Sequence, residues 1–198
     1  IYNSTKYFIS PVQHGFMQKK KSTVTNLTVF AQYVSEIIDC NGQCDVVYTE
    51  FTKAFNQIDH GWLLEKLTNL GFSNSLIQLF FSYLDKYQNF YSNSFIQSLG
   101  VPPGSNLGPL LFLYFVNDLA AVLPCRKLMF ADDLKLYAEV NSVDDCISLQ
   151  LCIDLLYSWC IRHHVLLNIR KCKVLSFSRK HISYSLTTTT STVHSSIK

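Results

Sequence analysis

Two adjacent carboxylates, Asp132 and Asp133, lie between two short, mainly apolar segments, residues 127–130 and 134–138. This pattern predicts two antiparallel strands joined by a tight turn, which can direct both carboxylates out of one end of a hairpin. Magnesium prefers carboxylate oxygens, and two ions about 3.5–4 Å apart can stabilise both oxygens of an in-line phosphoryl displacement. By itself the dipeptide is more typical of a solvated turn, so a metal site requires a third carboxylate from elsewhere.

A candidate for the third carboxylate is Glu50, which stands in a run of β-forming residues, 45–51, after the turn signal Asn41-Gly42. The run predicts a central strand with Glu50 at its carboxyl end. Because this strand and the hairpin are far apart in sequence, only the fold can bring the three carboxylates together.

Length and composition limit the possible folds and partners of the chain but do not identify its function. The chain has 198 residues, 48% of them hydrophobic, which is enough for one domain with a core of its own. A net charge of +3 is compatible with a nucleic-acid partner but does not require one. No apolar run is long enough to span a bilayer, so we expect no membrane partner. Since the chain begins at Ile1 rather than Met, we expect a fragment of a longer protein.

The seven cysteines are irregularly spaced, and no second pair or neighbouring histidine completes a zinc site around Cys40 and Cys44. We therefore expect reduced thiols and an intracellular location, in the nucleus or the cytoplasm.

Helical patterns surround these strands. Ser22 or Thr23 is predicted to cap a helix that reaches at least Glu36. Two further helices are expected near residues 62–70 and 75–84, followed by a hairpin over residues 87–99. A glycine-punctuated loop, residues 100–109, then opens a strongly apolar helix at 110–119.

The C-terminal third begins with an amphipathic helix. Ser142 and Asp145 have the spacing of a capping box, and the predicted apolar stripe consists of Ile147, Leu151, Leu155 and Trp159. His163 and His164 follow and are expected on the surface. A strand is predicted at 174–177, and from residue 183 the Thr/Ser-rich composition predicts disorder.

Taken in order, these features resemble the palm of a reverse transcriptase of the non-LTR retrotransposon type, as in jockey-like and other LINE elements. The match runs from Gln13 to Arg179. The matching segments are Gln13-His14-Gly15-Phe16, Ser22-Thr23-Val24-Thr25, Lys53-Ala54-Phe55, Asp59-His60, Gly100-Val101-Pro102, Gly104-Ser105, Leu107-Gly108-Pro109-Leu110-Leu111-Phe112, Asn117-Asp118-Leu119 and Phe130-Ala131-Asp132-Asp133.

The resemblance implies an α+β fold. A polymerase palm would occupy residues 45–180, with an antiparallel sheet, the acidic hairpin and helices packed on one face. Residues 1–44 would form part of the fingers, and residues 181–198 would be a disordered tail.

The resemblance also implies RNA-directed DNA synthesis from deoxynucleoside triphosphates on an RNA template with a DNA primer. Asp132, Asp133 and Glu50 would hold two Mg²⁺ ions, with Mn²⁺ as an alternative. Lys171 would act as general acid for the departing pyrophosphate, which needs a cation near the leaving group. A plain solvated lysine is the alternative for Lys171.

Further positions follow from the same resemblance. Phe55 matches an aromatic gate under the nucleotide sugar, although it can equally be a core residue. Gly104 and Ser105 match a loop that contacts template and nucleotide. Independently of the resemblance, charge and position make six basic residues available for nucleic-acid contact: Lys19, Lys20, Lys21, Lys173, Arg179 and Lys180.

Four positions depart from the family's pattern: Glu50 replaces aspartate, Asn56 replaces aspartate, Pro103 replaces glutamine and Met17 replaces arginine. The extra methylene of Glu50 moves the carboxylate by roughly an ångström, whereas catalytic groups must be held within about 0.5 Å. Such a displacement can cost about a hundredfold in rate. The resemblance also implies a basic fingers strand before Ile1 and a thumb after Arg179, which this sequence lacks. For both reasons we expect impaired activity.

Two other functions compete with this one. The first is a catalytically inactive remnant that binds nucleic acid weakly. The second is a generic metal-dependent phosphodiesterase, which is disfavoured because no nuclease-like histidine or additional acidic cluster accompanies Asp132 and Asp133.

Overall fold

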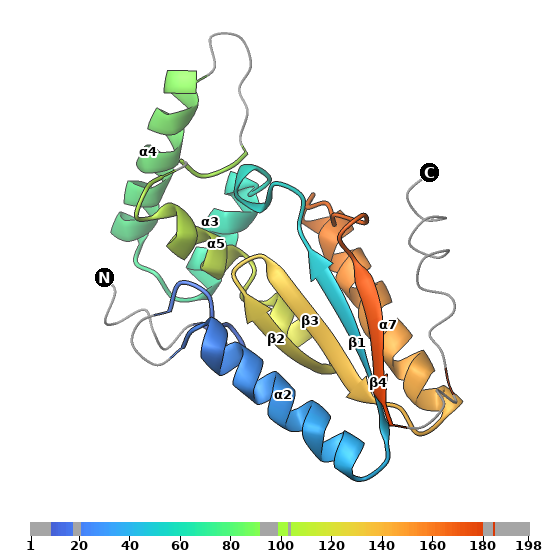
Figure 1. Cartoon of the computed structure of the whole chain (residues 1–198). Helices are drawn as coiled ribbons and strands as arrows, with labels where there is room; N and C mark the ends of the chain where they lie inside the picture. The colour runs from blue at the N-terminus through green and yellow to red at the C-terminus, as the bar shows by residue number, and fades with distance from the viewer. Residues whose placement is uncertain (1–8, 18–20, 92–98, 103, 180–183, 185–198) are drawn as a thin grey trace.

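The computed structural model describes residues 9–17, 21–91, 99–102, 104–179 and 184, and it contains one four-stranded antiparallel sheet in the order β2-β3-β1-β4 (Figure 1). The predicted central strand is confirmed as β1 (Gln43–Glu50). It pairs with β3 (Asp133–Glu139) on one side and β4 (Lys173–Ser178) on the other. Strand β2 (Arg126–Phe130) pairs with β3 to form the predicted hairpin.

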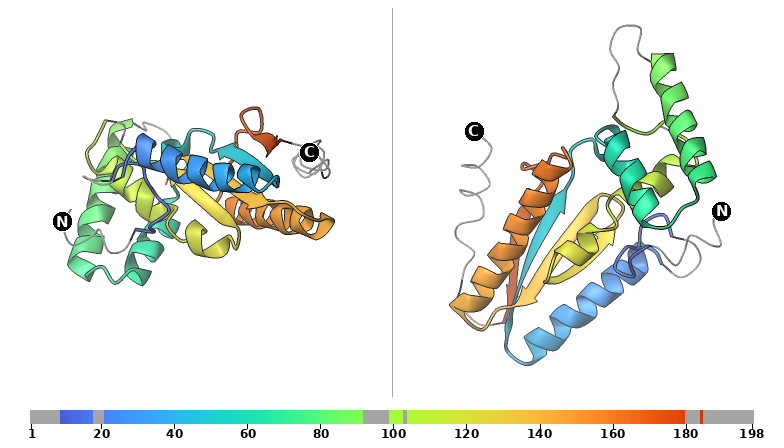
Figure 2. Two further views of the ribbon diagram at one scale, coloured as in Figure 1. Left: turned by 60° about the horizontal axis from the view of Figure 1, so that its bottom comes forward. Right: turned by 180° about the vertical axis from the view of Figure 1, so that it is seen from behind.

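Helices cover both faces of this sheet, with α2 (Thr23–Asp39) on one face and α7 (Val143–Arg162) on the other (Figure 2, left). Neighbouring strand residues point to opposite faces. Accordingly, Val46 belongs to the cluster around Phe30 of α2, whereas Val47 belongs to the cluster that contains Leu156 of α7. The α+β class is confirmed. The prediction that helices pack on one face of the sheet only is wrong, because both faces of β1 are apolar and each is covered by a helix.

A group of helices lies beyond the end of the sheet that carries the acidic turn (Figure 1). It comprises the short η1 (Ala54–Asn56), α3 (His60–Asn69), α4 (Asn74–Tyr91) and α5 (Gly108–Phe115). The short α6 (Leu119–Val122) follows α5 and contacts α7. The predicted hairpin over residues 87–99 is wrong in its first part, because helix α4 continues to residue 91. Residues 92–98 lie outside the described residues.

The cap of α7 is confirmed, but its predicted apolar stripe is confirmed only at Leu155 and Trp159, which pack against the core. The Ser142 side chain accepts a hydrogen bond from the Asp145 N–H, and the Asp145 carboxylate accepts one from the Asn141 N–H at 2.9 Å. Ile147 and Leu151, however, are 60% and 53% exposed. The buried residues are Leu149, Cys152, Ile153, Leu156, Trp159 and Cys160. The helix carries apolar residues on more than one face, and packing against the sheet selects which face is covered.

His163 is buried rather than on the surface, while His164 is exposed as predicted. The His163 ring stacks on Trp159 at 4.3 Å, and its Nδ1 lies 2.8 Å from the Trp159 carbonyl oxygen. Burial and the nearby Lys66 ammonium lower the pKa of His163. None of the helices in the described ranges has the length and apolar character needed to cross a membrane.

The core around β3 provides a test of this packing. Leu136 is fully buried, so Leu136→Ala is expected to lower the free energy of unfolding by about 2–5 kcal/mol in urea titrations. Leu151→Ala removes the same atoms from the exposed face of α7 and is expected to change stability by less than about 0.5 kcal/mol. Equal losses for the two variants would contradict the observed orientation of α7.

Candidate active site

The three candidate carboxylates gather at one end of the sheet. Glu50 is the last residue of β1 and pairs with Asp133, the first residue of β3, because the two strands are antiparallel. Asp132 lies in the turn between β2 and β3, directly after Ala131, whose φ of 55° is in the left-handed region. The fold therefore places the predicted third carboxylate beside the acidic hairpin.

The carboxylates interact electrostatically. The pKa of Asp133 is raised by burial and by the negative charges of Asp132 and Glu50, while Lys135 and Lys171 oppose the shift. Like charges this close disfavour ionisation of one another, and a bound cation relieves that repulsion. The site is thus electrostatically suited to cations.

Lys171 occupies part of this site. Its Nζ lies 2.6 Å from the Glu50 Oε1, and this hydrogen bond raises the pKa of Lys171. The loop that carries it is anchored to β1, since the Asn168 N–H donates to the Glu50 carbonyl oxygen at 2.8 Å. The Lys171 N–H in turn donates to the Asn168 carbonyl oxygen at 2.9 Å. A lysine 121 residues from Glu50 in sequence is therefore held against the carboxylates.

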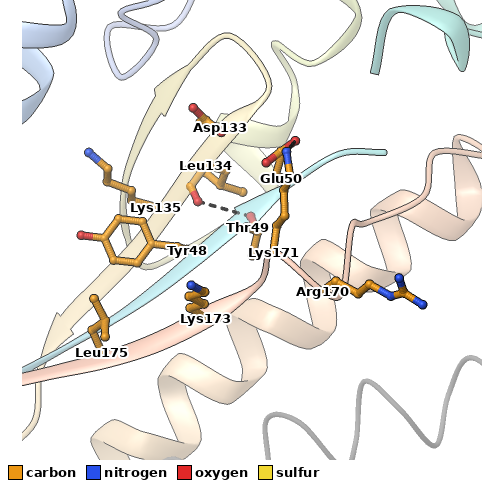
Figure 3. Close-up of a pocket in the computed structure, with 10 residues that line it drawn as sticks. All are labelled: Tyr48, Thr49, Glu50, Asp133, Leu134, Lys135, Arg170, Lys171, Lys173 and Leu175. Carbon is orange, nitrogen blue, oxygen red and sulfur yellow. Dashed lines mark hydrogen bonds and ion pairs between the residues drawn. The ribbon is translucent and has the colours of Figure 1, made fainter. Parts of the chain in front are cut away.

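A cavity of about 700 Å³ opens over these residues on the sheet face that carries α2 (Figure 3). Glu50 and Asp133 lie at one side of it. Its basic lining residues are Lys135, Arg170, Lys171 and Lys173. Lys171 and Lys173 come from the predicted site, but Lys135 and Arg170 are additions that the sequence did not single out. Strand alternation could have identified Lys135, because it is two residues from Asp133 in the same strand and therefore lies on the same face of the sheet.

The donor set fits a hard divalent cation in chemistry, since all three side chains offer carboxylate oxygens. Within the part of the chain that the structure describes, no three His, Cys, Asp or Glu side chains converge closely enough to hold a metal ion. Glu50 instead binds the Lys171 ammonium. Metal binding by all three carboxylates therefore requires Glu50 to exchange Lys171 for the cation.

The predicted nucleotide-contacting residues do not line this cavity. Phe55, in η1, is half-buried and contacts Phe112, with ring centroids 4.9 Å apart. Gly104 has a φ of 74° and open space where a Cβ would be, as suits close approach of a ligand. The Ser105 Oγ accepts a hydrogen bond from the Gly108 N–H at 2.9 Å and so stabilises the start of α5. Their roles toward a nucleotide remain predictions.

The predicted nucleic-acid residues are dispersed. Residues 19, 20 and 180 lie outside the described residues. Lys21 donates to two backbone carbonyl groups of the preceding segment. Arg179 pairs with Asp39 at 2.8 Å, next to the end of the sheet opposite Glu50. Among the members of this set that the structure describes, only Lys173 lines the cavity.

The other family departures lie around the site. Asn56 is exposed in η1, next to Phe55. Met17 is partly buried and packs against the hydrophobic cluster that contains Leu156 of α7. Pro103 lies outside the described residues. The side chain of Met17 therefore contributes to packing, where the family's arginine would offer a charge.

Comparison with known proteins identifies the family of this chain. A family model described as reverse transcriptase (RNA-dependent DNA polymerase) matches residues 3–194. In Drosophila melanogaster, the probable RNA-directed DNA polymerase from transposon BS is 30% identical over 190 residues, covering 86% of this chain. The RNA-directed DNA polymerase from mobile element jockey, from the same organism, is 26% identical over 187 residues, covering 87%. The chain spans 20% of the length of each relative.

Solved structures show the same fold at low identity. Apo telomerase from Candida tropicalis, truncated from its C-terminal domain, superposes with a TM-score of 0.64 at 12% identity, covering 92% of this chain and 39% of that chain. Telomerase from Candida albicans, in complex with a fragment of telomeric RNA, gives 0.54 at 10% identity, covering 82% and 31%. The chain therefore belongs to the reverse transcriptase (RNA-dependent DNA polymerase) family, as a domain of the non-LTR retrotransposon type.

Proposed function

We propose that this domain carries the chemistry of RNA-directed DNA synthesis, in which the 3′-hydroxyl of a DNA primer attacks the α-phosphate of an incoming deoxynucleoside triphosphate. The observation that supports the proposal best is the pairing of Glu50 with Asp133 at the ends of β1 and β3, with Asp132 in the adjoining turn. Glu50 and Asp133, from two segments distant in sequence, both line the groove that opens on the sheet.

Reverse transcriptases use divalent metal ions, and in this chain Asp132, Asp133 and Glu50 would hold two Mg²⁺ ions or, alternatively, Mn²⁺. When bound, such ions stabilise the charges on the attacking and leaving oxygens. Burial and the negative charges of Asp132 and Glu50 raise the pKa of Asp133, and a bound cation would relieve the repulsion among these carboxylates. Lys171, whose pKa is raised, stays protonated beside them and can supply a proton to the departing pyrophosphate.

The other cations of the cavity suit the nucleic-acid backbone. Lys135 and Lys173 project from β3 and β4 on the sheet face that carries Glu50 and Asp133, and Arg170 lies beside them. Lys135 is held in place, since its Nζ donates to the Asn26 Oδ1 at 2.9 Å. We infer that template and primer phosphates contact this basic side of the groove, with Phe55, Gly104 and Ser105 nearer the nucleotide.

Lys173→Ala is expected to reduce the salt dependence of binding to an RNA–DNA hybrid. Loss of one phosphate contact lowers the slope of log K against log salt concentration by about 0.7–0.9. Fluorescence anisotropy titrations of a labelled hybrid over a series of salt concentrations measure this slope. Arg162→Ala removes a charge from α7, on the other face of the sheet, and is expected to leave the slope unchanged. Equal changes in both variants would mean that binding follows net charge rather than the groove.

A catalytically inactive remnant is the second candidate, and the Glu50–Lys171 ion pair favours it. One Glu50 oxygen is engaged by the ammonium at 2.6 Å, and the longer side chain displaces the carboxylate from the position an aspartate would take. Such a protein would still bind nucleic acid through the basic side of the groove.

Primer extension on an annealed RNA template, with Mg²⁺ and separately with Mn²⁺, separates the two candidates. Extension that disappears in Asp132→Ala supports polymerase chemistry at this site. Retention of the hybrid without any extension, in the chain as given and in Glu50→Asp, supports the remnant. We propose an intracellular setting, in the nucleus or cytoplasm, where such a template is available.

A further inference from the structure

Gln13 is a buried side chain outside the proposed catalytic set, and it is bonded to the acidic turn. It is 2% exposed. Its Oε1 accepts hydrogen bonds from the N–H groups of Ala131 at 3.0 Å and Gly15 at 2.8 Å. Its Nε2 donates to the Ala131 carbonyl oxygen at 3.3 Å. One amide thus binds both backbone groups of the residue that precedes Asp132.

The backbone around Gln13 follows the edge of β2. The His14 N–H donates to the Met129 carbonyl oxygen at 2.8 Å, and the Met129 N–H donates to the Val12 carbonyl oxygen at 3.0 Å. A Cβ added at Gly15 would overlap the Ala131 nitrogen. Only glycine therefore allows this segment to approach the turn closely, which explains two members of the Gln13-His14-Gly15-Phe16 motif.

Ala131 needs such support. A residue with a Cβ in the left-handed region is strained and persists where its surroundings fix it. The strained residue immediately precedes Asp132 and Asp133, so its conformation sets the direction in which the turn presents both carboxylates. Hydrogen-bonding partners that fix a turn also fix the geometry of the ligands it carries.

We propose that Gln13 is a positioning residue that holds the acidic turn in its metal-binding conformation. The inference rests on the proposed function, because it assumes that Asp132 and Asp133 bind divalent cations. It adds a residue 118 positions away from the turn to the machinery of the site.

The test is Mn²⁺ affinity of the whole chain, measured by electron paramagnetic resonance of the free ion. Gln13→Met keeps the size of the side chain but removes its hydrogen bonds, and it is expected to weaken Mn²⁺ binding about 10–100-fold. Gln13→Glu keeps an acceptor for both N–H groups and is expected to fall between Gln13→Met and the parent. Thermal melts followed by circular dichroism establish that each variant is folded at the temperature of the titration.

Gln43→Met is the matched control. Gln43 is 6% exposed and lies at the opposite end of β1, where its Nε2 donates to the Asp45 Oδ1 at 2.9 Å and to the Tyr184 carbonyl oxygen at 2.8 Å. Both Gln13→Met and Gln43→Met remove buried hydrogen bonds and are expected to lower the melting temperature, but Gln43→Met is expected to leave Mn²⁺ affinity at the parent value.

The outcomes distinguish this inference from the proposed function. Parent affinity in Gln13→Met, together with loss of binding in Asp133→Asn, would overturn the positioning role and leave the metal site intact. Equal loss of affinity in Gln13→Met and Gln43→Met would reduce Gln13 to a general structural role and also overturn it. A parent chain whose Mn²⁺ binding does not depend on Asp133 would overturn the proposed metal site, and the positioning role with it.

Discussion

Replacing Glu50 by aspartate is expected to raise the rate of primer extension on an RNA template about a hundredfold in Mg²⁺. The Glu50 carboxylate extends to Lys171, with 2.6 Å between Oε1 and Nζ. A side chain one methylene shorter withdraws from Lys171 and brings its carboxylate back toward the strand end, beside Asp133. Magnesium demands near-ideal octahedral geometry, so we expect the gain to be larger in Mg²⁺ than in Mn²⁺.

The measurement compares single-nucleotide extension rates of the parent and Glu50→Asp under both metals. Glu50→Gln is the control for side-chain length, since it keeps the methylenes and removes the charge. It is expected to extend no primers. Equal rates in the parent and Glu50→Asp would mean that Glu50 is not the lesion, and that the departures at Met17, Asn56 and Pro103 must account for any deficit.

Asp133→Asn, introduced into the Glu50→Asp chain, is expected to reduce primer extension to the level of a reaction without protein. Asn keeps the size of the side chain but removes a carboxylate that the proposed metal site requires. The same loss is expected for Asp132→Ala. Asp154→Asn, on α7 across the sheet, makes the same chemical change away from the cavity and is expected to retain full activity.

The melting temperature of Asp133→Asn distinguishes loss of catalytic activity from loss of folding. The pKa of Asp133 is raised in the folded chain by burial and neighbouring carboxylates, so its ionised form is disfavoured there relative to the unfolded chain. The folded chain therefore holds the Asp133 proton more tightly than the unfolded chain, and stability falls as the pH rises through the range in which Asp133 ionises. Asp133→Asn is therefore expected to keep or raise the melting temperature while abolishing extension. A lowered melting temperature with partial activity would point instead to a structural role for Asp133.

Local patterns predicted much of the fold. The caps of α2 and α7 are confirmed, because a capping side chain and its backbone partner lie three residues apart. The central strand and the acidic hairpin are confirmed as well, since their apolar runs and turn residues are contiguous. The motif order that carries the family resemblance is likewise a property of the chain itself, and the family match agrees with it.

Predictions that required a choice between faces were less successful. On α7, the sequence offers more than one apolar stripe; of the predicted one, Trp159 is buried, whereas Ile147 and Leu151 are exposed. His163 looked like the polar end of a helix, yet it is stacked on Trp159. In both cases the side chain's environment depends on what the rest of the chain places opposite the helix.

The sequence by itself determined the family, the acidic hairpin and the central strand, and it singled out the three candidate carboxylates. The tertiary structure alone decided that Glu50 lies beside Asp133 and binds Lys171, that Lys135 and Arg170 line the groove, and that Gln13 hydrogen-bonds to the backbone of Ala131. The physical reason is the sequence distance over which each kind of interaction acts. Caps, turns and strand alternation act over a few residues, whereas these contacts join residues more than 80 positions apart through strand register and core packing.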